Sequence, residues 1–325
     1  MNNITGDKML AHIDRVFGEH KPITADVFLN NFCNNKCPYC TYRRWELEPG
    51  ARSMSVDDFI TYAKRMRELG VLGIILTGGG EPTVSKDFDA ITQWLQDNDY
   101  HYGINTNFNV VKYIAPDYLK VSLDGWDEDS YYAHRGVRHY RKVRDNIKKY
   151  AEWKRKNNIQ TSLGIQILAM SVGEVQKFYD ANKDLPVDYI SIRPMESTFG
   201  TYYSQLLSRT SAPSYSLPQE IIKSIEAIRS IDKRVILNYK WTLLDRQESS
   251  CVAQWAQLAI NELGEVMYCC HKPYQIVGHI LDEDIMQKKE NTPTDMHTCD
   301  IPCRMTGPNL EVLKLLSPKK DVNFI

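Results

Sequence analysis

The strongest constraint on the fold is an alternation of short apolar segments with amphipathic ones. We expect strands at 25–31, 71–77, 101–105, 118–123, 161–168 and 187–193. We expect helices between most of them, at 55–69, 85–96, 137–156 and 172–182. Strands that alternate with helices form a parallel sheet covered by helices. The sequence therefore predicts an α/β fold, a partial (β/α)6 barrel of the TIM type.

Polar residues and glycines follow most of these predicted strands. Three cysteines come after the first strand, and the segments 78–82, 105–107, 122–125 and 193–196 follow the second, third, fourth and sixth. In barrels of this type the carboxyl ends of the strands carry the active site. We therefore expect the functional residues at this edge of the sheet.

Charge and composition exclude several classes of function. The 325 residues include 40 basic and 41 acidic ones, which gives a net charge of -1, so we expect no nucleic-acid or membrane partner held by charge. The first twenty residues lack the apolar core of a secretory signal, and no segment is apolar for the length of a membrane span. A cytoplasmic location is predicted.

The eight cysteines fall into two groups that residues 41–250 separate. In a reducing compartment, clustered cysteines bind metal or do redox work more often than they form disulfides. The first group is Cys33, Cys37 and Cys40. The second is Cys251, Cys269, Cys270, Cys299 and Cys303.

The spacing within the first group suits a 4Fe–4S cluster. Three residues separate Cys33 from Cys37, and two separate Cys37 from Cys40. Thiolates are the usual ligands of such clusters, and three of them leave one iron open as a binding position. A zinc site is the alternative, although no further Cys or His lies nearby in the sequence to complete four ligands.

The segment Cys-Asn-Asn-Lys-Cys-Pro-Tyr-Cys at 33–40 resembles the signature of the radical S-adenosylmethionine (radical SAM) superfamily. Gly-Gly-Gly-Glu-Pro at 78–82 stands where that superfamily has its glycine-rich motif, and 122–125 with 135–136 resembles the fourth-strand region of members with auxiliary clusters. Strand-end caps are the alternative for single polar residues. The resemblance implies these SAM-binding residues: Tyr39, Gly78, Gly79, Gly80, Glu81, Asn105, Thr106, Asn107, Ser122 and Asp124. For Glu81 it leaves open an acceptor or a conformational lock.

The resemblance also implies a shared first step. The open iron binds the methionine end of SAM, and a reduced flavodoxin or ferredoxin supplies one electron. The sulfonium bond breaks, and the 5′-deoxyadenosyl radical that forms removes a hydrogen atom from the substrate.

The second cysteine group resembles the module called twitch, the shortened form of the SPASM module. We expect a hairpin of strands at 257–262 and 265–268, and 277–281 also resembles a piece of that module. Five cysteines are too few for the two clusters of a full SPASM module, so the resemblance implies one auxiliary 4Fe–4S cluster. The expected ligands are Cys251, Cys269, Cys299 and Cys303.

Cys270 is then left over, because adjacent strand residues point to opposite faces. Zinc at the same four thiols is the alternative, and His271 and His297 are near enough to be other ligands. The predicted domains are a barrel at 1–235 with an extension at 1–24, the auxiliary module at 236–310, and a tail at 311–325.

A cluster with four thiolate ligands cannot coordinate substrate, but it can take an electron. In module order and cysteine spacing the chain resembles the aminocyclitol dehydrogenase of butirosin biosynthesis. The resemblance implies oxidation of a small polar metabolite or sugar-like alcohol, with the auxiliary cluster accepting an electron. Arg193 and Glu196 are candidates to bind and deprotonate the substrate, with a surface ion pair as the alternative.

Three other functions stay open. A radical epimerase could use Cys270 as its hydrogen donor. A peptide-modifying enzyme is less favoured, because only about 24 residues precede the first predicted strand and many such relatives carry a recognition domain there. A redox or scaffold protein would not need the Gly-Gly-Gly-Glu-Pro motif.

Overall fold

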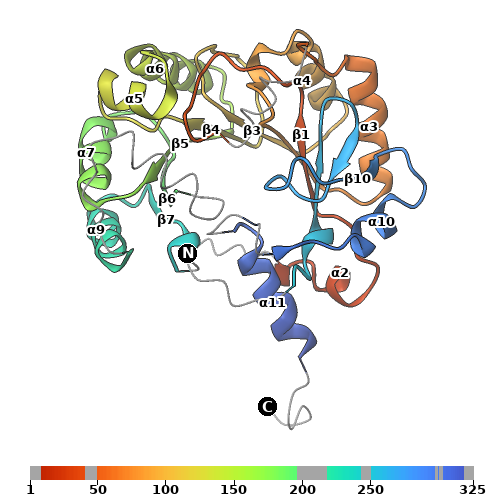
Figure 1. Ribbon diagram of the computed structural model, residues 1–325. Helices are drawn as coiled ribbons and strands as arrows, with labels where there is room; N and C mark the ends of the chain where they lie inside the picture. The colour runs from red at the N-terminus through yellow and green to blue at the C-terminus, as the bar shows by residue number, and fades with distance from the viewer. Residues whose placement is uncertain are drawn as a thin grey trace.

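The computed structural model describes residues 9–40, 50–195, 218–242, 250–296, 299 and 303–317. Their framework is an open ten-stranded sheet (Figure 1) in the order β10-β9-β8-β1-β2-β3-β4-β5-β6-β7. The strands are β1 (Thr24–Phe28), β2 (Gly73–Thr77), β3 (Tyr102–Thr106), β4 (Tyr118–Ser122), β5 (Ser162–Ala169), β6 (Tyr189–Pro194), β7 (Val235–Leu237), β8 (Gln257–Ile260), β9 (Glu265–Met267) and β10 (Ile276–His279).

The predicted α/β fold is confirmed as a largely parallel, unclosed barrel. Strands β1 to β7 pair in parallel in chain order, and β8 pairs in parallel with the other side of β1. Strand β9 runs antiparallel to both β8 and β10. Strand β7 was not predicted, because three residues are too few to show a periodicity.

The helices are α2 (Ile13–Phe17), α3 (Val56–Glu68), α4 (Phe88–Asp97), α5 (Glu128–Arg135), α6 (Tyr140–Lys156), α7 (Val172–Asn182), α9 (Pro218–Ile231), α10 (Ile285–Asn291) and α11 (Thr306–Leu316). The four helices predicted between strands are confirmed. Helix α5 was not predicted; Asp127 caps it by accepting from the Ser130 backbone N–H at 2.7 Å. It ends at Gly136, whose φ of 70° places it in the left-handed region.

The helices α3 to α7 and α9 cover the outer face of the curved sheet (Figure 1). Every second residue of the inner strands, such as Val121, Ile165 and Ile192, packs into the core with Val143 and Phe178 of these helices. Because side chains alternate along a strand, the residues between them face the concave side. Burial of each large apolar side chain in this core contributes about 1.5–3 kcal/mol.

The C-terminal part of the chain packs on the barrel. Trp255 lies in one apolar cluster with Val16, Met305 and Val312. Helix α11 crosses the predicted boundary at 310, and the division into domains stays a prediction. None of the helices in the described ranges is long and apolar enough to span a membrane.

Candidate active site at the carboxyl ends of the strands

The first cysteine group lies in the loop that follows β1, and N–H donors are directed at its sulfur atoms. The backbone N–H of Asn35 lies 3.3 Å from the sulfur of Cys33, and the amide of Asn107 lies 3.7 Å from it. Arg135 donates from Nη1 to the sulfur of Cys37 at 3.5 Å. Such bonds favour a thiolate, and hydrogen bonds to sulfur are one means of tuning an iron–sulfur cluster.

Cys33 is exposed at the surface of this loop, but its surroundings still disfavour a bare thiolate. Partial desolvation, followed by the nearby Glu81 carboxylate, raises the pKa of the Cys33 thiol to about 12. A thiolate in that position needs a positive charge beside it, and a bound metal centre supplies one. The residues of the loop therefore fit an iron–sulfur cluster.

The glycine-rich segment passes directly against the chain that enters the cysteine loop. The Glu81 N–H donates to the Phe32 carbonyl, and Asn30 donates from Nδ2 to the Glu81 carbonyl, both at 2.9 Å. A Cβ at Gly80 would lie 1.9 Å from the Phe32 carbonyl oxygen, and Gly79 has a φ of 96°. Only glycine fits these two positions.

The Glu81 carboxylate is fully engaged inside the protein. It accepts from Thr83 Oγ1 at 2.7 Å, from Thr106 Oγ1 at 2.5 Å and from the Asn107 backbone N–H at 2.8 Å. Burial raises the pKa of Glu81, while these bonds oppose that shift. Of the two roles expected for Glu81, the geometry fits the conformational lock, which ties the end of β2 to the end of β3.

Two further asparagine contacts fix the cysteine loop to the strand ends. Asn107 donates from Nδ2 to Asn34 Oδ1, and Asn109 donates from Nδ2 to Asn35 Oδ1, both at 2.6 Å. Asn105 donates to Thr77 Oγ1 at 3.1 Å. Of the predicted SAM-binding residues at the end of β3, Asn107 therefore contacts the cysteine loop directly, whereas Asn105 bonds to the end of β2.

Asp124 and Arg135 form a buried ion pair behind the cysteine loop. Asp124 is 0% exposed, accepts from the Leu168 backbone N–H at 2.7 Å, and pairs with Nη2 of Arg135. Burial opposes the charge of Arg135, but Tyr39 and Cys37 more than offset it and raise the Arg135 pKa. Arg135 was not predicted as a site residue, although it belongs to the Arg-Gly pair at 135–136 that resembles the superfamily.

Tyr39 packs edge-to-face on His134, with ring centroids 6.0 Å apart, and His134 also contacts Trp126. Burial lowers the pKa of His134 to about 4, so its ring is neutral near pH 7. Tyr39, one of the expected SAM-binding residues, therefore packs on a neutral imidazole ring.

Side chains at alternate positions of β4, β5 and β6 face the concave side of the sheet. Arg193 donates from Nη1 to Gln166 Oε1 at 3.1 Å. Lys120 and Ser191 occupy equivalent positions on the neighbouring strands, and Ser122 ends β4. Glu196, the other predicted substrate-binding residue, lies outside the described residues.

The second cysteine group gathers from separate segments. Asn309 donates to the sulfur of Cys251 at 3.6 Å, and the Met305 backbone N–H to that of Cys303 at 3.3 Å. Burial raises the pKa of Cys251 to about 11; Asn309 opposes this shift, and Cys303 and Cys299 add to it. Burial likewise raises the pKa of Cys269, with Cys303 among the contributors. These thiols share one buried environment.

Cys270 lies on the barrel side of this group. The sulfur of Cys270 accepts a hydrogen bond from Nη1 of Arg304 at 2.9 Å. This Nη1 atom also pairs with the carboxylate of Asp26 in β1 at 2.5 Å. Cys270 packs with Phe28 and Met267. The choice of Cys269 as ligand and the hydrogen-donor role of Cys270 stay predictions; His297 lies outside the described residues.

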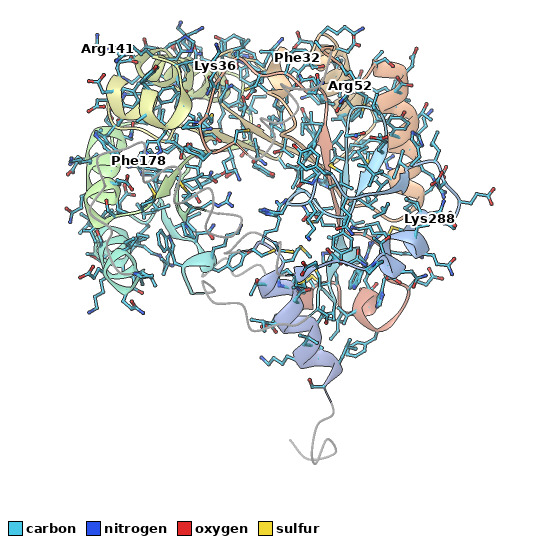
Figure 2. The ribbon with its side chains drawn as sticks, in the orientation of Figure 1. Phe32, Lys36, Arg52, Arg141, Phe178 and Lys288 are labelled. Atoms are coloured by element: carbon cyan, nitrogen blue, oxygen red, sulfur yellow. The ribbon has the colours of Figure 1, made fainter. Side chains whose placement is uncertain are left out.

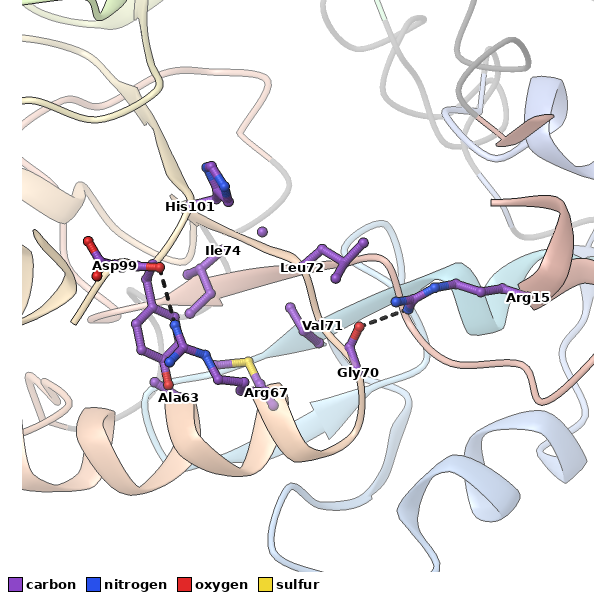
Figure 3. A pocket seen from close by; sticks show the side chains of 12 residues that line it. Arg15, Ala63, Arg67, Gly70, Val71, Leu72, Ile74, Asp99 and His101 are labelled. Carbon is purple, nitrogen blue, oxygen red and sulfur yellow. Dashed lines mark hydrogen bonds between the residues drawn. The ribbon is translucent and has the colours of Figure 1, made fainter. Parts of the chain in front are cut away.

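A cavity of about 240 Å³ lies at the opposite edge of the sheet, near the amino ends of β2 and β3 (Figure 3). Its two arginines are engaged with the backbone: Arg15 donates to the Gly70 carbonyl at 2.8 Å, and Arg67 donates to the Asp99 carbonyl at 3.3 Å. The cysteine loop lies at the other edge, around Phe32 and Lys36 in Figure 2. In this fold the amino ends serve stability, so the cavity is not the candidate active site.

Comparison with known proteins agrees with this site. Residues 27–181 match the model of the Radical SAM superfamily. A Methanocaldococcus jannaschii protein named as a candidate glycyl-radical enzyme activating enzyme is 24% identical over 188 residues, 54% of this chain and 72% of that protein. A Pyrococcus horikoshii protein named as a probable GTP 3′,8-cyclase is 31% identical over 145 residues, 42% of this chain and 45% of that protein.

Two solved structures share the fold. Streptococcus suis SuiB superposes with a TM-score of 0.63 at 16% identity, covering 88% of this chain and 70% of that one. The structure of anSMEcpe with bound AdoMet superposes with a TM-score of 0.59 at 16% identity, covering 86% of this chain and 83% of that one. The superfamily match contains the cysteine triplet, the glycine-rich segment and the Asp124–Arg135 pair. The chain therefore carries a radical SAM superfamily domain at residues 27–181.

Proposed function

We propose that this chain is a radical SAM enzyme that oxidises a polar substrate. The single observation that carries the proposal is the cysteine loop, whose sulfurs receive donors from Asn35, Asn107 and Arg135. When bound, the cluster and SAM supply the one-electron cleavage and the radical that removes a hydrogen atom. The chain holds both in place and keeps water away.

Each predicted residue has a task in this proposal. Cys33, Cys37 and Cys40 hold the 4Fe–4S cluster. The backbone of 78–80 receives the methionine end of SAM, since the Glu81 and Thr106 side chains are already bonded to each other. The remainder of the SAM site is lined by Tyr39, Asn105, Asn107 and Ser122. Asp124 acts on the site indirectly, because it pairs with Arg135.

A polar substrate is supported by the concave face of the sheet. Lys120, Gln166, Ser191 and Arg193 stand at alternating, inward positions of three adjacent strands. Cations and amides on such a surface suit a substrate that carries hydroxyl, carboxylate or phosphate groups. We propose that Arg193 and Glu196 bind and deprotonate the substrate. Glu196 lies outside the described residues.

Oxidation is supported by the second cysteine group. A carbon radical that loses one more electron becomes the oxidised product, so the reaction needs an acceptor. Cys251, Cys269, Cys299 and Cys303 would hold that acceptor as a 4Fe–4S cluster. A flavodoxin or ferredoxin is the proposed donor for the first cluster, and the proposed location is the cytoplasm.

A peptide substrate is the second candidate function. The titles of similar structures record SuiB with its precursor peptide SuiA and anSMEcpe with a Cp18Cys peptide. At 15% and 17% identity these similarities concern the fold alone. The substrate experiment below distinguishes this alternative.

The first test is SAM cleavage. Anaerobically reconstituted protein, dithionite and SAM should give 5′-deoxyadenosine, measured by mass spectrometry. The matched control replaces Cys33, Cys37 and Cys40 by alanine. Equal yields from the wild type and the control would contradict the proposed initiation.

The second test separates the possible reactions. Deuterated polyols, aminocyclitols and short peptides are offered in turn, and deuterium in 5′-deoxyadenosine identifies the substrate. A ketone product supports oxidation. A product in which one deuterium is replaced by a solvent-derived hydrogen at an inverted centre, with no other change, indicates an epimerase, and Cys270→Ala should then abolish it.

A further inference from the structure

Lys289 of α10 is a fully buried lysine next to the second cysteine group. Its exposed fraction is 0%, and its ammonium donates to the Tyr268 carbonyl. The same nitrogen lies 5.3 Å from the centroid of the Tyr268 ring. Its neighbour Lys288 points outward instead (Figure 2) and pairs with Asp282 at 3.0 Å and Asp284 at 2.9 Å.

Burial of an ammonium group requires a compensating negative charge. Among the described residues, the charges that act on Lys289 come from Cys269, Cys251 and Cys270. Burial lowers the pKa of Lys289 to about 8, and these three cysteines oppose that shift. A carbonyl and an aromatic ring alone do not neutralise a cation, so the counter-charge that suits Lys289 is the thiolate group itself.

A closed 4Fe–4S cluster presents such a charge. Four thiolates make the cluster anionic, and one added electron makes it more negative by one charge. A buried cation stabilises the more negative form more strongly, because charges attract strongly where little water screens them. It therefore favours electron uptake.

We infer that Lys289 is a positioning residue that raises the reduction potential of the auxiliary cluster and so makes it an electron acceptor. The inference rests on the proposed function, since it requires a cluster at the second cysteine group. It specifies the direction of electron flow: from the substrate radical to the cluster, which is reduced by one electron as the substrate is oxidised.

The test measures the midpoint potential of the auxiliary cluster by EPR-monitored redox titration. The Cys33, Cys37 and Cys40 triple alanine variant serves as background, so that only the second cluster contributes to the signal. In that background Lys289→Met and Lys289→Gln remove the charge, Lys289→Arg keeps it, and Lys288→Met is the matched surface control. Iron content and ultraviolet circular dichroism are recorded for every variant.

We expect Lys289→Met and Lys289→Gln to lower the reduced-to-oxidised ratio at fixed potential at least tenfold, which is about 59 mV for a one-electron couple. Lys288→Met should leave the midpoint potential of the auxiliary cluster unchanged. An iron-containing neutral variant with the parent potential would overturn the inference.

Three other outcomes are decided by iron content. If the background variant itself binds no iron, the proposed auxiliary cluster is wrong. If the neutral variants lose the iron and Lys289→Arg retains it at the parent potential, charge is still the cause. If all three Lys289 variants lose it, the residue acts through packing and the inference fails.

Discussion

Both cysteine regions contain an arginine that joins a buried aspartate to a cysteine sulfur, but the two arginines reach different kinds of cysteine. Arg135 links Asp124 to Cys37, which is a predicted cluster ligand. Arg304 links Asp26 to Cys270, the cysteine predicted to be left over. The same contact thus supports a ligand in one region, and in the other it ties the spare thiol to β1.

The regions also differ in how they are assembled. The first three cysteines lie within eight consecutive residues of one loop, from Cys33 to Cys40. The second group comes from separate segments around Cys251, Cys269, Cys299 and Cys303. The buried Lys289 lies next to this group. The first region is a local motif, whereas the second exists only in the folded chain.

The largest expected effects distinguish the two cysteine regions by iron content per chain and by SAM cleavage. Alanine at Cys33, Cys37 and Cys40 should reduce iron from about eight to about four per chain and abolish 5′-deoxyadenosine formation. Alanine at Cys251 and Cys299 should cause the same iron loss but retain SAM cleavage. Iron analysis and mass spectrometry check both, and equal loss of cleavage in the two variants would contradict the division of roles.

The next effect compares the two arginines. Arg135→Met leaves Asp124 buried without its cation, and Arg304→Met does the same to Asp26, so each should lower the free energy of unfolding by about 3–5 kcal/mol. Denaturant titration measures it. Arg138→Ala, which breaks an exposed pair with Asp129, is the control and should change the free energy of unfolding only slightly. An effect of that small size at Arg135 would mean that its ion pair is solvated.

A third effect depends on pH and belongs to the first region alone. The folded-state pKa of His134, about 4, lies below its ordinary value of 6.5. Its stabilising contribution is therefore complete above pH 6.5 and is lost as the pH falls toward 4, by up to about 3 kcal/mol. The unfolding free energies of the wild type and His134→Gln should converge across that window. Parallel curves would show that the ring is charged in the fold.

The smallest effect concerns Cys270. Cys270→Ala removes one hydrogen bond to Arg304, which keeps its pairing with Asp26, so stability should fall by about 1–2 kcal/mol. Iron content should stay at the wild-type value. A loss of about four irons would instead make Cys270 a ligand and reverse the choice between it and Cys269.

Much of the fold and the first region could be predicted from the sequence. The periodicity located six strands, because each buries alternate side chains against a helix. The choice between the two expected roles of Glu81 could not be predicted, since its partners Thr106 and Asn107 come from the end of the next strand. Lys289 stands beside Lys288 and Glu290 and has the appearance of a surface residue; only the packing of α10 on Tyr268 buries it.

The parallel pairing of β8 with β1 has a consequence for the growing chain. Of the two neighbours of β1, β2 follows it soon in the chain. The other neighbour, β8, is synthesised only after β7, so until then β1 is an open edge of the sheet. Such an edge can pair with other chains while the long-range contact is awaited. The C-terminal part thus closes off an aggregation-prone surface at the same time as it gathers its own cysteines.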